Sequence, residues 1–432
     1  MKKVFLPHHS LFLLLGLVLL ITTSCQDKCT SIRTYKRYIP TTVSLKDLPK
    51  GISTQAPQAM VKPGKIYAKD NYLFVVESGK GIHIIDNTNA SAPTTVSFLA
   101  IPGNGDMAIK DNYLYVDNYS DLVVLDISNP KAIKEVGRSV AAFPYSLGNM
   151  SQDTYWYLDI QNQNIIYYQS KLVTDTVTTN CGGDYDGGVM YDLVGSTGSG
   201  FSSSSGTSTS TGTGTGTGGS MARFTIYDTY LYATSMSELL VYDIKNQTIP
   251  QNKSKISLGW GAETIFPYKD KLFIGSNTGM YIFDNAKPEA PVRLSTFSHA
   301  RACDPVVVDG NTAYITLRTG TCGSAPNQLL TVDISVISSP VLLKSLPMQH
   351  PFGLGIDFPN LFVCEGEYGL KSMDASNPSD VKLLQQISSV NAYDVIILGK
   401  KHLLMVGKGG LYQYDYTDPK NLKQLSVISV NN

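Results

Sequence analysis

The chain has 432 residues, of which 16% are charged, and its formal net charge is zero. Without an excess of lysine and arginine it lacks the basic surface that binds nucleic acid, so we expect no nucleic-acid partner. The 26 tyrosines, against two tryptophans, are typical of strands with half-buried faces. Beyond the N-terminus no stretch has the 3.6-residue apolar period of a helix. These features favour an all-β fold.

Residues 1–24 have the layout of an export signal. Lys2 and Lys3 form a positive start, and Leu11–Ile21 is an eleven-residue apolar run, short of the roughly 20 residues that span a bilayer. Small residues then precede Cys25. The arrangement resembles a bacterial lipoprotein signal, in which the cysteine becomes the lipidated first residue. This implies a cell-envelope protein, an outer-membrane lipoprotein facing the periplasm or the surface, attached only by its lipid; ordinary secretion is the alternative.

Residues 25–64 are interpreted as a tether, after which one strand pattern recurs seven times. Each copy has a short apolar strand followed by a second one that ends in aspartate. The first strands are 72–75, 113–116, 230–233, 271–274, 313–316, 361–364 and 403–406. The closing aspartates are Asp86, Asp126, Asp243, Asp284, Asp333, Asp374 and Asp415. Their spacings of 40, 117, 41, 49, 41 and 41 residues indicate a repeat of about 41 residues.

The aspartates open segments such as Asp126-Ile-Ser-Asn-Pro130. An aspartate side chain accepts hydrogen bonds from the backbone just ahead of it, and proline fixes φ and removes a strand donor. We therefore interpret these aspartates as turn residues between the third and fourth strands of each unit, not as catalytic groups.

Units of this length with four short strands are typical of propeller blades, which bury their faces against their neighbours. We predict a seven-bladed β-propeller of four-stranded antiparallel blades over residues 65–430. Eight blades are the alternative if Tyr157–Ile160 belongs to a degenerate blade, but too few residues precede it to build two more strands.

The segment Leu122-Val-Val-Leu-Asp-Ile-Ser-Asn-Pro130 resembles the LVIVD-repeat family of bacterial envelope proteins, common as lipoproteins of the Bacteroidota. The second, sixth and seventh copies match best. The resemblance implies a β-propeller fold but little about function, because one fold serves many roles.

The long spacing places an insertion at about 144–220, between the second and third blades. Its low-complexity part, 195–219, consists almost entirely of Gly, Ser and Thr and is expected to be a flexible linker. Its first part carries apolar residues that can pack. Asp175-Thr176-Val177 resembles an acceptor sequence for O-glycosylation, which makes Thr176 a candidate.

Cysteines are informative in an exported chain, because disulfides form there. Cys303 starts the inner strand of the fifth blade, and Cys322 lies in its lengthened loop, 318–328. A disulfide between them is plausible and would add on the order of 3 kcal/mol. Cys364 lies inside a strand and is expected to be a buried thiol.

The candidate binding residues come from aligning the inner strands. Six of seven copies place a charged residue at the strand start. Three aromatic residues, Trp260, Phe352 and Tyr393, and a histidine lie nearby. The candidates are Lys65, Asp106, Arg223, Glu263, Asp304 and Asp394, with Trp260 and His350. We expect a mixed-charge, net acidic channel mouth on the face that carries the insertion.

Two interpretations of this mouth stay open. The carboxylates and Arg223 bind a polar ligand or a calcium ion, or the charges only neutralise one another around a wet channel. No catalytic motif occurs, and no catalytic residue or cofactor is assigned. The leading hypothesis is an envelope-anchored binding module for a protein or glycan. The alternatives are a lyase or hydrolase acting on an envelope polymer through its acidic residues, and a structural propeller without a small ligand.

Overall fold

The computed structural model describes residues 28–144, 154–180, 192–193, 217–218, 220–235, 237–259, 261–302, 305–319, 325–399 and 401–430. These residues form strands β1 to β34 and one 3-10 helix, η1 (Leu45–Asp47). The all-β prediction is confirmed for them. Among the same residues, no helix is long and apolar enough to cross a bilayer.

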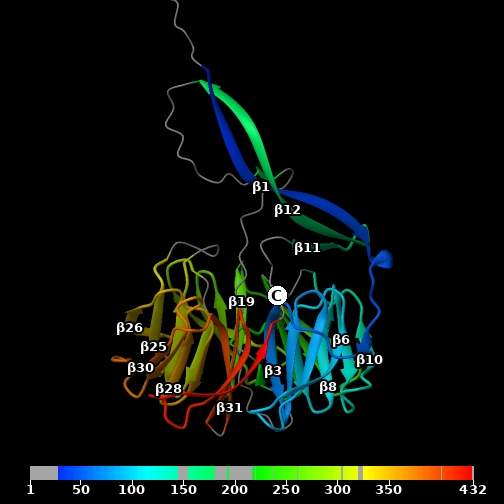
Figure 1. The fold of residues 1–432 in the computed structure, drawn as a ribbon. Helices are drawn as coiled ribbons and strands as arrows, with labels where there is room; N and C mark the ends of the chain where they lie inside the picture. Colours follow the sequence, from blue (N-terminus) through cyan, green and yellow to red (C-terminus); the bar gives the residue numbers. More distant parts are fainter. Residues whose placement is uncertain are drawn as a thin grey trace, which may run out of the picture. The chain divides into compact units, whose positions relative to one another are not determined.

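Seven sheets share one pattern, in which four consecutive strands pair antiparallel in chain order (Figure 1). We number them sheet 1 to sheet 7 along the chain. The inner strands are β3 (Pro63–Lys69), β7 (Met107–Lys110), β15 (Phe224–Tyr227), β19 (Ala262–Tyr268), β23 (Val306–Asp309), β27 (Leu354–Asp357) and β31 (Ala392–Gly399). The second strands are β4 (Tyr72–Glu77), β8 (Tyr113–Asn118), β16 (Tyr230–Thr234), β20 (Lys271–Ser276), β24 (Thr312–Leu317), β28 (Asn360–Cys364) and β32 (His402–Gly407).

The third strands all end at the aspartates of the repeat. They are β5 (Gly81–Asp86), β9 (Asp121–Asp126), β17 (Glu238–Asp243), β21 (Gly279–Asp284), β25 (Gln328–Asp333), β29 (Leu370–Asp374) and β33 (Gly410–Asp415). The outer strands are β6 (Thr94–Ala100), β10 (Lys134–Ser139), β18 (Gln251–Ser257), β22 (Val292–Ser298), β26 (Val341–Pro347), β30 (Lys382–Ile387) and β34 (Lys423–Ser429). All seven predicted strand pairs are thus confirmed as second and third strands.

The inner strands contact one another in a cycle. β3 meets β7, then β15, β19, β23, β27 and β31 follow in order, and β31 returns to β3. The sheets therefore surround a central channel, with their inner strands as its wall.

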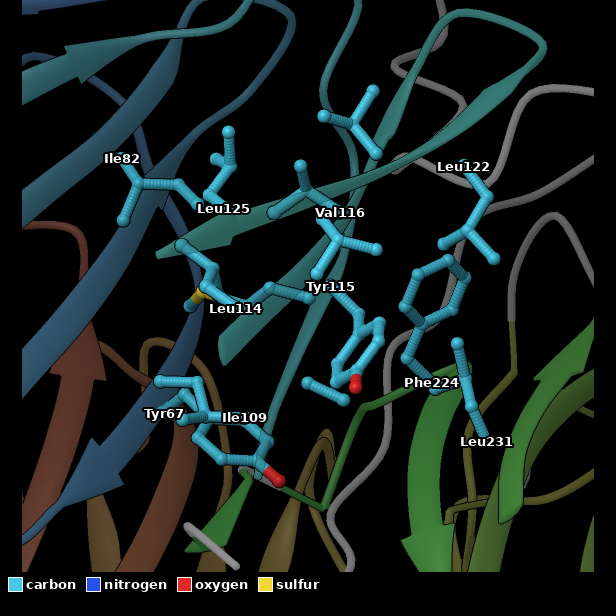
Figure 2. Close-up of a cluster of buried hydrophobic side chains, with 14 of the residues drawn as sticks. Tyr67, Ile82, Ile109, Leu114, Tyr115, Val116, Leu122, Leu125, Phe224 and Leu231 are labelled. Atoms are coloured by element: carbon cyan, nitrogen blue, oxygen red, sulfur yellow. The ribbon is translucent and has the colours of Figure 1, made fainter. Parts of the chain in front are cut away.

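The core lies between neighbouring sheets. Leu122, Val123, Val124 and Leu125 of β9 are all fully buried, because other sheets cover both faces of sheet 2. Figure 2 shows such a cluster, in which side chains of sheets 1, 2 and 3 meet around Tyr115. A continuous apolar run in the sequence is what two covered faces require.

The seven aspartates make the turn hydrogen bond that the sequence predicts. Each side chain accepts the backbone N–H two residues ahead; Ser128 N donates to Asp126 Oδ1 at 2.9 Å, and Thr417 N to Asp415 Oδ1 at 2.7 Å. The other five bonds belong to Asp86, Asp243, Asp284, Asp333 and Asp374. The turn interpretation is confirmed.

These turns predict a loss of stability in acid. The hydrogen bonds lower the pKa of Asp126, Asp333 and Asp374 below the usual value of 3.8. A lowered folded-state pKa contributes stability above the unfolded-state value, and that contribution is lost as the pH falls through the folded-state value. We expect the free energy of unfolding, measured with urea, to drop between pH 5 and pH 2. The drop should be smaller in Asp126→Asn, because the asparagine side chain does not titrate. If the free energy of unfolding depends on pH equally in this variant and in the parent protein, the drop does not come from the Asp126 turn.

Sheet 1 differs from the other six because it has six strands. β2 (Ser53–Gln55) pairs antiparallel with the outer strand β6, and β14 (Thr217–Gly218) pairs antiparallel with the inner strand β3. Residues 217–218 of the low-complexity stretch therefore form a paired strand and are not a free linker.

The eighth sheet has the order β11-β12-β1-β13. Its strands are β1 (Lys28–Ser44), β11 (Thr154–Asp159), β12 (Asn164–Asn180) and β13 (Asp192–Leu193). Residues 157–160 therefore do not start an eighth repeat unit. By its contacts the chain forms two compact units, 1–39 with 169–198 and 40–168 with 199–432. In the smaller unit Tyr35 OH donates to Asp175 Oδ2 at 2.6 Å.

Candidate ligand-binding site

The predicted charged residues lie at the starts of the inner strands, as the alignment indicates. Lys65 and Glu263 are in β3 and β19, Asp394 is in β31, and Asp106 and Arg223 directly precede β7 and β15. All five are buried, with at most 6% of the residue surface exposed. Asp304 and Trp260 lie outside the described residues.

Asp106 is the centre of a buried ionic cluster. Its Oδ2 accepts Lys65 Nζ at 2.5 Å and Arg223 N at 2.6 Å, and its Oδ1 accepts Met107 N at 2.7 Å. Burial lowers the pKa of Lys65 and of Arg223, while the negative charges of Asp106 and Glu263 oppose this effect. The carboxylate therefore joins sheets 1, 2 and 3 around the channel.

A second buried carboxylate, Asp117, holds the loop in front of Asp106. Its Oδ1 accepts Gly105 N at 2.8 Å, Asp106 N at 2.9 Å and Asn104 Nδ2 at 3.0 Å. Burial raises the pKa of Asp117 to about 7, although these donors favour the charged form. Alignment of inner strands cannot find this residue, because it lies at the end of a second strand.

The end of the insertion crosses the channel. β14 pairs with β3, and Ser220 Oγ accepts Leu354 N and donates to Asp394 Oδ1, both at 2.7 Å. Ala222 O accepts Ile265 N at 3.3 Å. Residues 217–218 and 220–222 thus contact four inner strands, β3, β19, β27 and β31. Ser220 is fully buried, so in this part the channel is filled by protein and not, as in one sequence interpretation, by water.

Among the seven aligned inner-strand starts, Gly353 is the one without a charge. The end of the insertion, at Ser220, explains why no side chain stands there. A Cβ at Gly353 would lie 2.2 Å from Asp394 Oδ1 and 2.6 Å from Ser220 Oγ. Both approaches are shorter than any real Cβ contact, so a side chain here would displace Ser220. The break in the predicted charge column is therefore the place where the inserted segment passes.

A pocket of about 350 Å³ opens beside this segment. It is lined by residues of sheets 1, 5, 6 and 7 and by Met221. Its charged lining residues are four cationic ones and a single carboxylate. They are Lys62, Lys65, Arg318, Lys408 and Asp394. The lining is therefore net positive, whereas the sequence predicts a net acidic mouth.

Phe352 and Tyr393 give the pocket an aromatic wall. Their ring centroids are 5.4 Å apart, and His350 packs edge-on against Phe352 at 4.9 Å. The guanidinium carbon of Arg318 lies 4.2 Å from the Phe352 centroid, the geometry of a cation–π contact. Burial and the charge of Arg318 lower the pKa of His350. The predicted candidate His350 thus supports the wall, and Phe352 and Tyr393 line the pocket.

Buried glutamates hold two rim loops. Glu77 accepts Val61 N at 3.0 Å and Lys62 N at 2.8 Å, and His83 Nε2 lies 3.2 Å from it. Glu365 accepts Gln349 N at 2.7 Å and pairs with Lys371 Nζ at 2.6 Å. Both occupy the same position of the repeat, five residues after the first residue of the observed second strand, which is Tyr72 in β4 and Asn360 in β28. Alignment of the second-strand ends would have found them.

The alignment of inner strands also missed three cations of the pocket, Lys62, Arg318 and Lys408. Each lies in a loop outside the strands, and Arg318 and Lys408 directly follow the second strands β24 and β32. An alignment of inner strands does not include these loops. Because the loops converge only when the ring of sheets closes, the excess of positive charge is visible in three dimensions alone.

Some of the remaining candidates lie in the part of the chain that the structure describes, and others lie outside it. Cys25, Cys303 and Cys322 lie outside the described residues, so the lipidation site and the disulfide stay predictions. Thr176 is exposed in β12, as a glycosylation site requires. Cys364 is a buried free thiol whose pKa is raised by burial, as predicted. Within the described residues no group of three or more His, Cys, Asp or Glu is arranged to hold a metal ion.

Comparison with known proteins identifies the repeat. The LVIVD repeat profile matches residues 63–99, 104–140 and 300–346. These stretches are sheets 1, 2 and 5. The profile thus matches the second copy, as expected, but the expectation that the sixth and seventh copies match best is wrong, because the profile does not match them. No curated protein matches the sequence significantly.

Three solved structures are similar in fold. A periplasmic gluconolactonase of Pseudomonas aeruginosa has a TM-score of 0.48 and 11% identity, with 85% of this chain and 97% of that chain covered. A protein from Lactobacillus plantarum has the same four values, 0.48, 11%, 85% and 97%. BamB from Moraxella catarrhalis has a TM-score of 0.46 and 9% identity, with 87% and 99% covered.

The four-stranded sheets and their cyclic contacts define the class: the chain is a repeat protein of the β-propeller type. More particularly, three of its repeats, in sheets 1, 2 and 5, match the LVIVD repeat.

Proposed function

We propose that this chain is an exported, lipid-anchored, seven-bladed β-propeller that binds a ligand of the bacterial cell envelope. The seven repeat sheets and the cycle of their inner strands support this number of blades. The positive start, the apolar run and Cys25 in the first 25 residues support export and lipid attachment. The family resemblance favours an outer-membrane lipoprotein of the Bacteroidota.

The observation that carries the binding role is the construction of the pocket. Its two rim loops are held by buried glutamates, and its wall is a packed group of aromatic side chains. A pocket built on rigid elements loses little conformational entropy when a ligand enters. Its volume of about 350 Å³ lies within the usual range of ligand sites.

The contacts of the inner carboxylates favour binding over catalysis. Asp106 accepts an ammonium group and two close backbone N–H groups, and Asp394 Oδ1 accepts Ser220 Oγ and Val395 N. A general acid or base needs an atom within reach of the substrate proton. These oxygens instead hold the protein together, which makes the enzyme hypothesis the weaker one.

A direct binding experiment tests the proposal. The full mature chain is titrated with envelope glycan and envelope protein fractions, next to the Lys62→Glu/Lys408→Glu variant. We expect saturable binding to one fraction and a loss of at least about tenfold in the variant, equivalent to 1.4 kcal/mol. The control is Lys245→Glu/Lys287→Glu, which alters two exposed lysines next to the aspartate turns and should bind like the parent.

Absence of binding to every fraction would contradict a binding role for this chain. Equal affinity in the pocket variant would place the binding surface elsewhere on the propeller.

A further inference from the structure

We infer that the outer edge of sheet 5 binds an extended segment of a partner protein, which lies over the junction between sheets 5 and 6. This surface is separate from the pocket and does not depend on the pocket's ligand. Three features carry the inference: a strand already added at the same edge of sheet 1, a buried N–H group without an acceptor, and exposed leucines.

The outer edge of sheet 1 shows how this fold accepts an added strand. β2 pairs antiparallel with residues 98–100 of β6. Thr54 of β2 also reaches the neighbouring sheet 2, where its Oγ1 accepts Ile133 N at 3.2 Å. The added strand therefore covers the junction between two sheets. Sheet 5 ends at β26, with no strand beyond it among the described residues.

Val381 takes in sheet 6 the place of Ile133 in sheet 2, directly before the outer strand. In sheets 1, 3, 4 and 5 this residue is proline, which has no N–H to satisfy. In sheet 7 it is Leu422, whose N donates to Gln385 Oε1 at 2.6 Å. Val381 N has no acceptor among the described residues, although Val381 is only 5% exposed. Buried N–H groups are rarely left without a partner, so this one is open to an acceptor from another molecule.

Sheet 5 cannot supply this acceptor from the corresponding side chain. Lys344 and Gln385 have the same register on their outer strands, opposite the residue two before the closing aspartate. The amide oxygen of Gln385 accepts Leu422 N, whereas an ammonium group offers only donors. Lys344 is exposed and makes no ion pair with a described residue. An added segment can provide an oxygen for Val381 N and a carboxylate for Lys344.

Apolar side chains are exposed at the same junction. Val341, Leu342 and Leu343 of β26 are 57%, 47% and 37% exposed, and Leu383 of β30 is 52% exposed. At the register of Leu342 and Leu383 the other five sheets carry polar or charged residues, which are Thr95, Glu135, Asn252, Arg293 and Gln424. Charged residues usually protect a sheet edge, and clustered apolar ones mark an interface. The two neighbouring sheets without this protection are those that meet at Val381.

These features define the chemistry of the segment. An extended chain adds to a sheet edge through its backbone, and its alternate side chains give specificity. Apolar residues of the segment contact Leu342 and Leu383, and an acidic residue pairs with Lys344. Pro347 ends β26 and has no N–H, so the pairing is confined to the residues before it.

The experiment selects short random peptides, displayed on phage, against the full mature chain. We expect the selected peptides to alternate apolar and polar residues and to carry an acidic residue. One of them is synthesised and titrated by calorimetry. The variant Leu342→Lys/Leu383→Lys should bind it at least about tenfold more weakly. The control Val136→Lys/Val427→Lys alters valines that are 40% and 37% exposed on the outer strands of sheets 2 and 7, and it should bind the peptide like the parent.

A matched pair of variants tests the N–H group itself. Lys344→Gln gives sheet 5 the amide oxygen that Gln385 supplies in sheet 6. It should slow hydrogen exchange of Val381 N–H in the free protein and weaken the peptide, whereas Gln385→Lys should speed the exchange of Leu422 N–H. In the parent protein, the bound peptide should slow exchange at Val381 and leave Leu422 unchanged.

Four results would each overturn the inference. The first is that no peptide is selected, or that the leucine variant binds the peptide as tightly as the parent. The second is unchanged exchange at Val381 in the complex, which rules out an added strand over this junction. The third is a parent chain that is dimeric in ultracentrifugation and a leucine variant that is monomeric, which assigns the edge to a second copy. The fourth is loss of binding only in Lys62→Glu/Lys408→Glu, which moves the peptide to the pocket.

Discussion

Replacing Asp106 by alanine is expected to lower the free energy of unfolding by about 3–5 kcal/mol, the range for removing one partner of a buried ion pair. The change leaves the ammonium group of Lys65 buried without its carboxylate. It also removes the acceptor of Arg223 N and Met107 N. Urea unfolding at pH 7, followed by circular dichroism, measures the loss.

Two variants control this prediction. Asp380→Ala removes an acid from the exposed pair with Lys382 and should cost at most about 1 kcal/mol. The double variant Lys65→Met/Asp106→Ala no longer buries an unpaired charge and should recover part of the stability lost in Asp106→Ala. A loss below about 1 kcal/mol in Asp106→Ala would mean that the cluster does not hold sheets 1, 2 and 3 together.

Asp117 is expected to make the protein less stable as the pH rises from 4 to 8. Burial raises the pKa of this carboxyl from 3.8 to about 7, so the folded state holds the proton more tightly than the unfolded state. Its stabilising contribution is complete below the unfolded-state pKa and is lost as the pH rises through the folded-state pKa. At about 1.36 kcal/mol per pH unit, the loss amounts to roughly 4 kcal/mol.

The variant Asp117→Asn isolates this effect. The amide keeps an oxygen that can accept Gly105 N and Asp106 N but does not titrate. The free energy of unfolding should therefore depend less on pH between 4 and 8 in the variant. Burial lowers the pKa of His83, so the contribution of this residue to the stability of the protein is lost in the opposite direction, as the pH falls. Because His83 is present in both proteins, the difference between them reports Asp117 alone. Parallel pH profiles would contradict the prediction.

The fold was largely predictable because its signals are local. The turn aspartates bond to backbone N–H groups two residues ahead, so their effect does not depend on distant parts of the chain. The apolar runs of the second and third strands are also local signals, because each can be recognised within a few consecutive residues. The pairing of β1 with β12 was missed, since partners such as Tyr35 and Asp175 are 140 residues apart and no turn links them.

The candidate site was predictable only in part. Lys65, Asp106, Arg223, Glu263 and Asp394 were placed correctly on the channel wall, because each begins the inner strand of its repeat. Their surroundings were not predictable. Ser220 reaches Asp394 across 174 residues of sequence, and it directly follows the stretch 195–219, whose composition indicates only a flexible linker.

The sequence by itself determined the repeat, its strands and its turns, because each depends on alternation and hydrogen bonding within a few residues. The tertiary structure alone decided that a segment of the insertion crosses the channel and that the pocket beside it is cationic. Lys62, Arg318 and Lys408 come from sheets 1, 5 and 7, and they become neighbours only because the inner strands close into a ring.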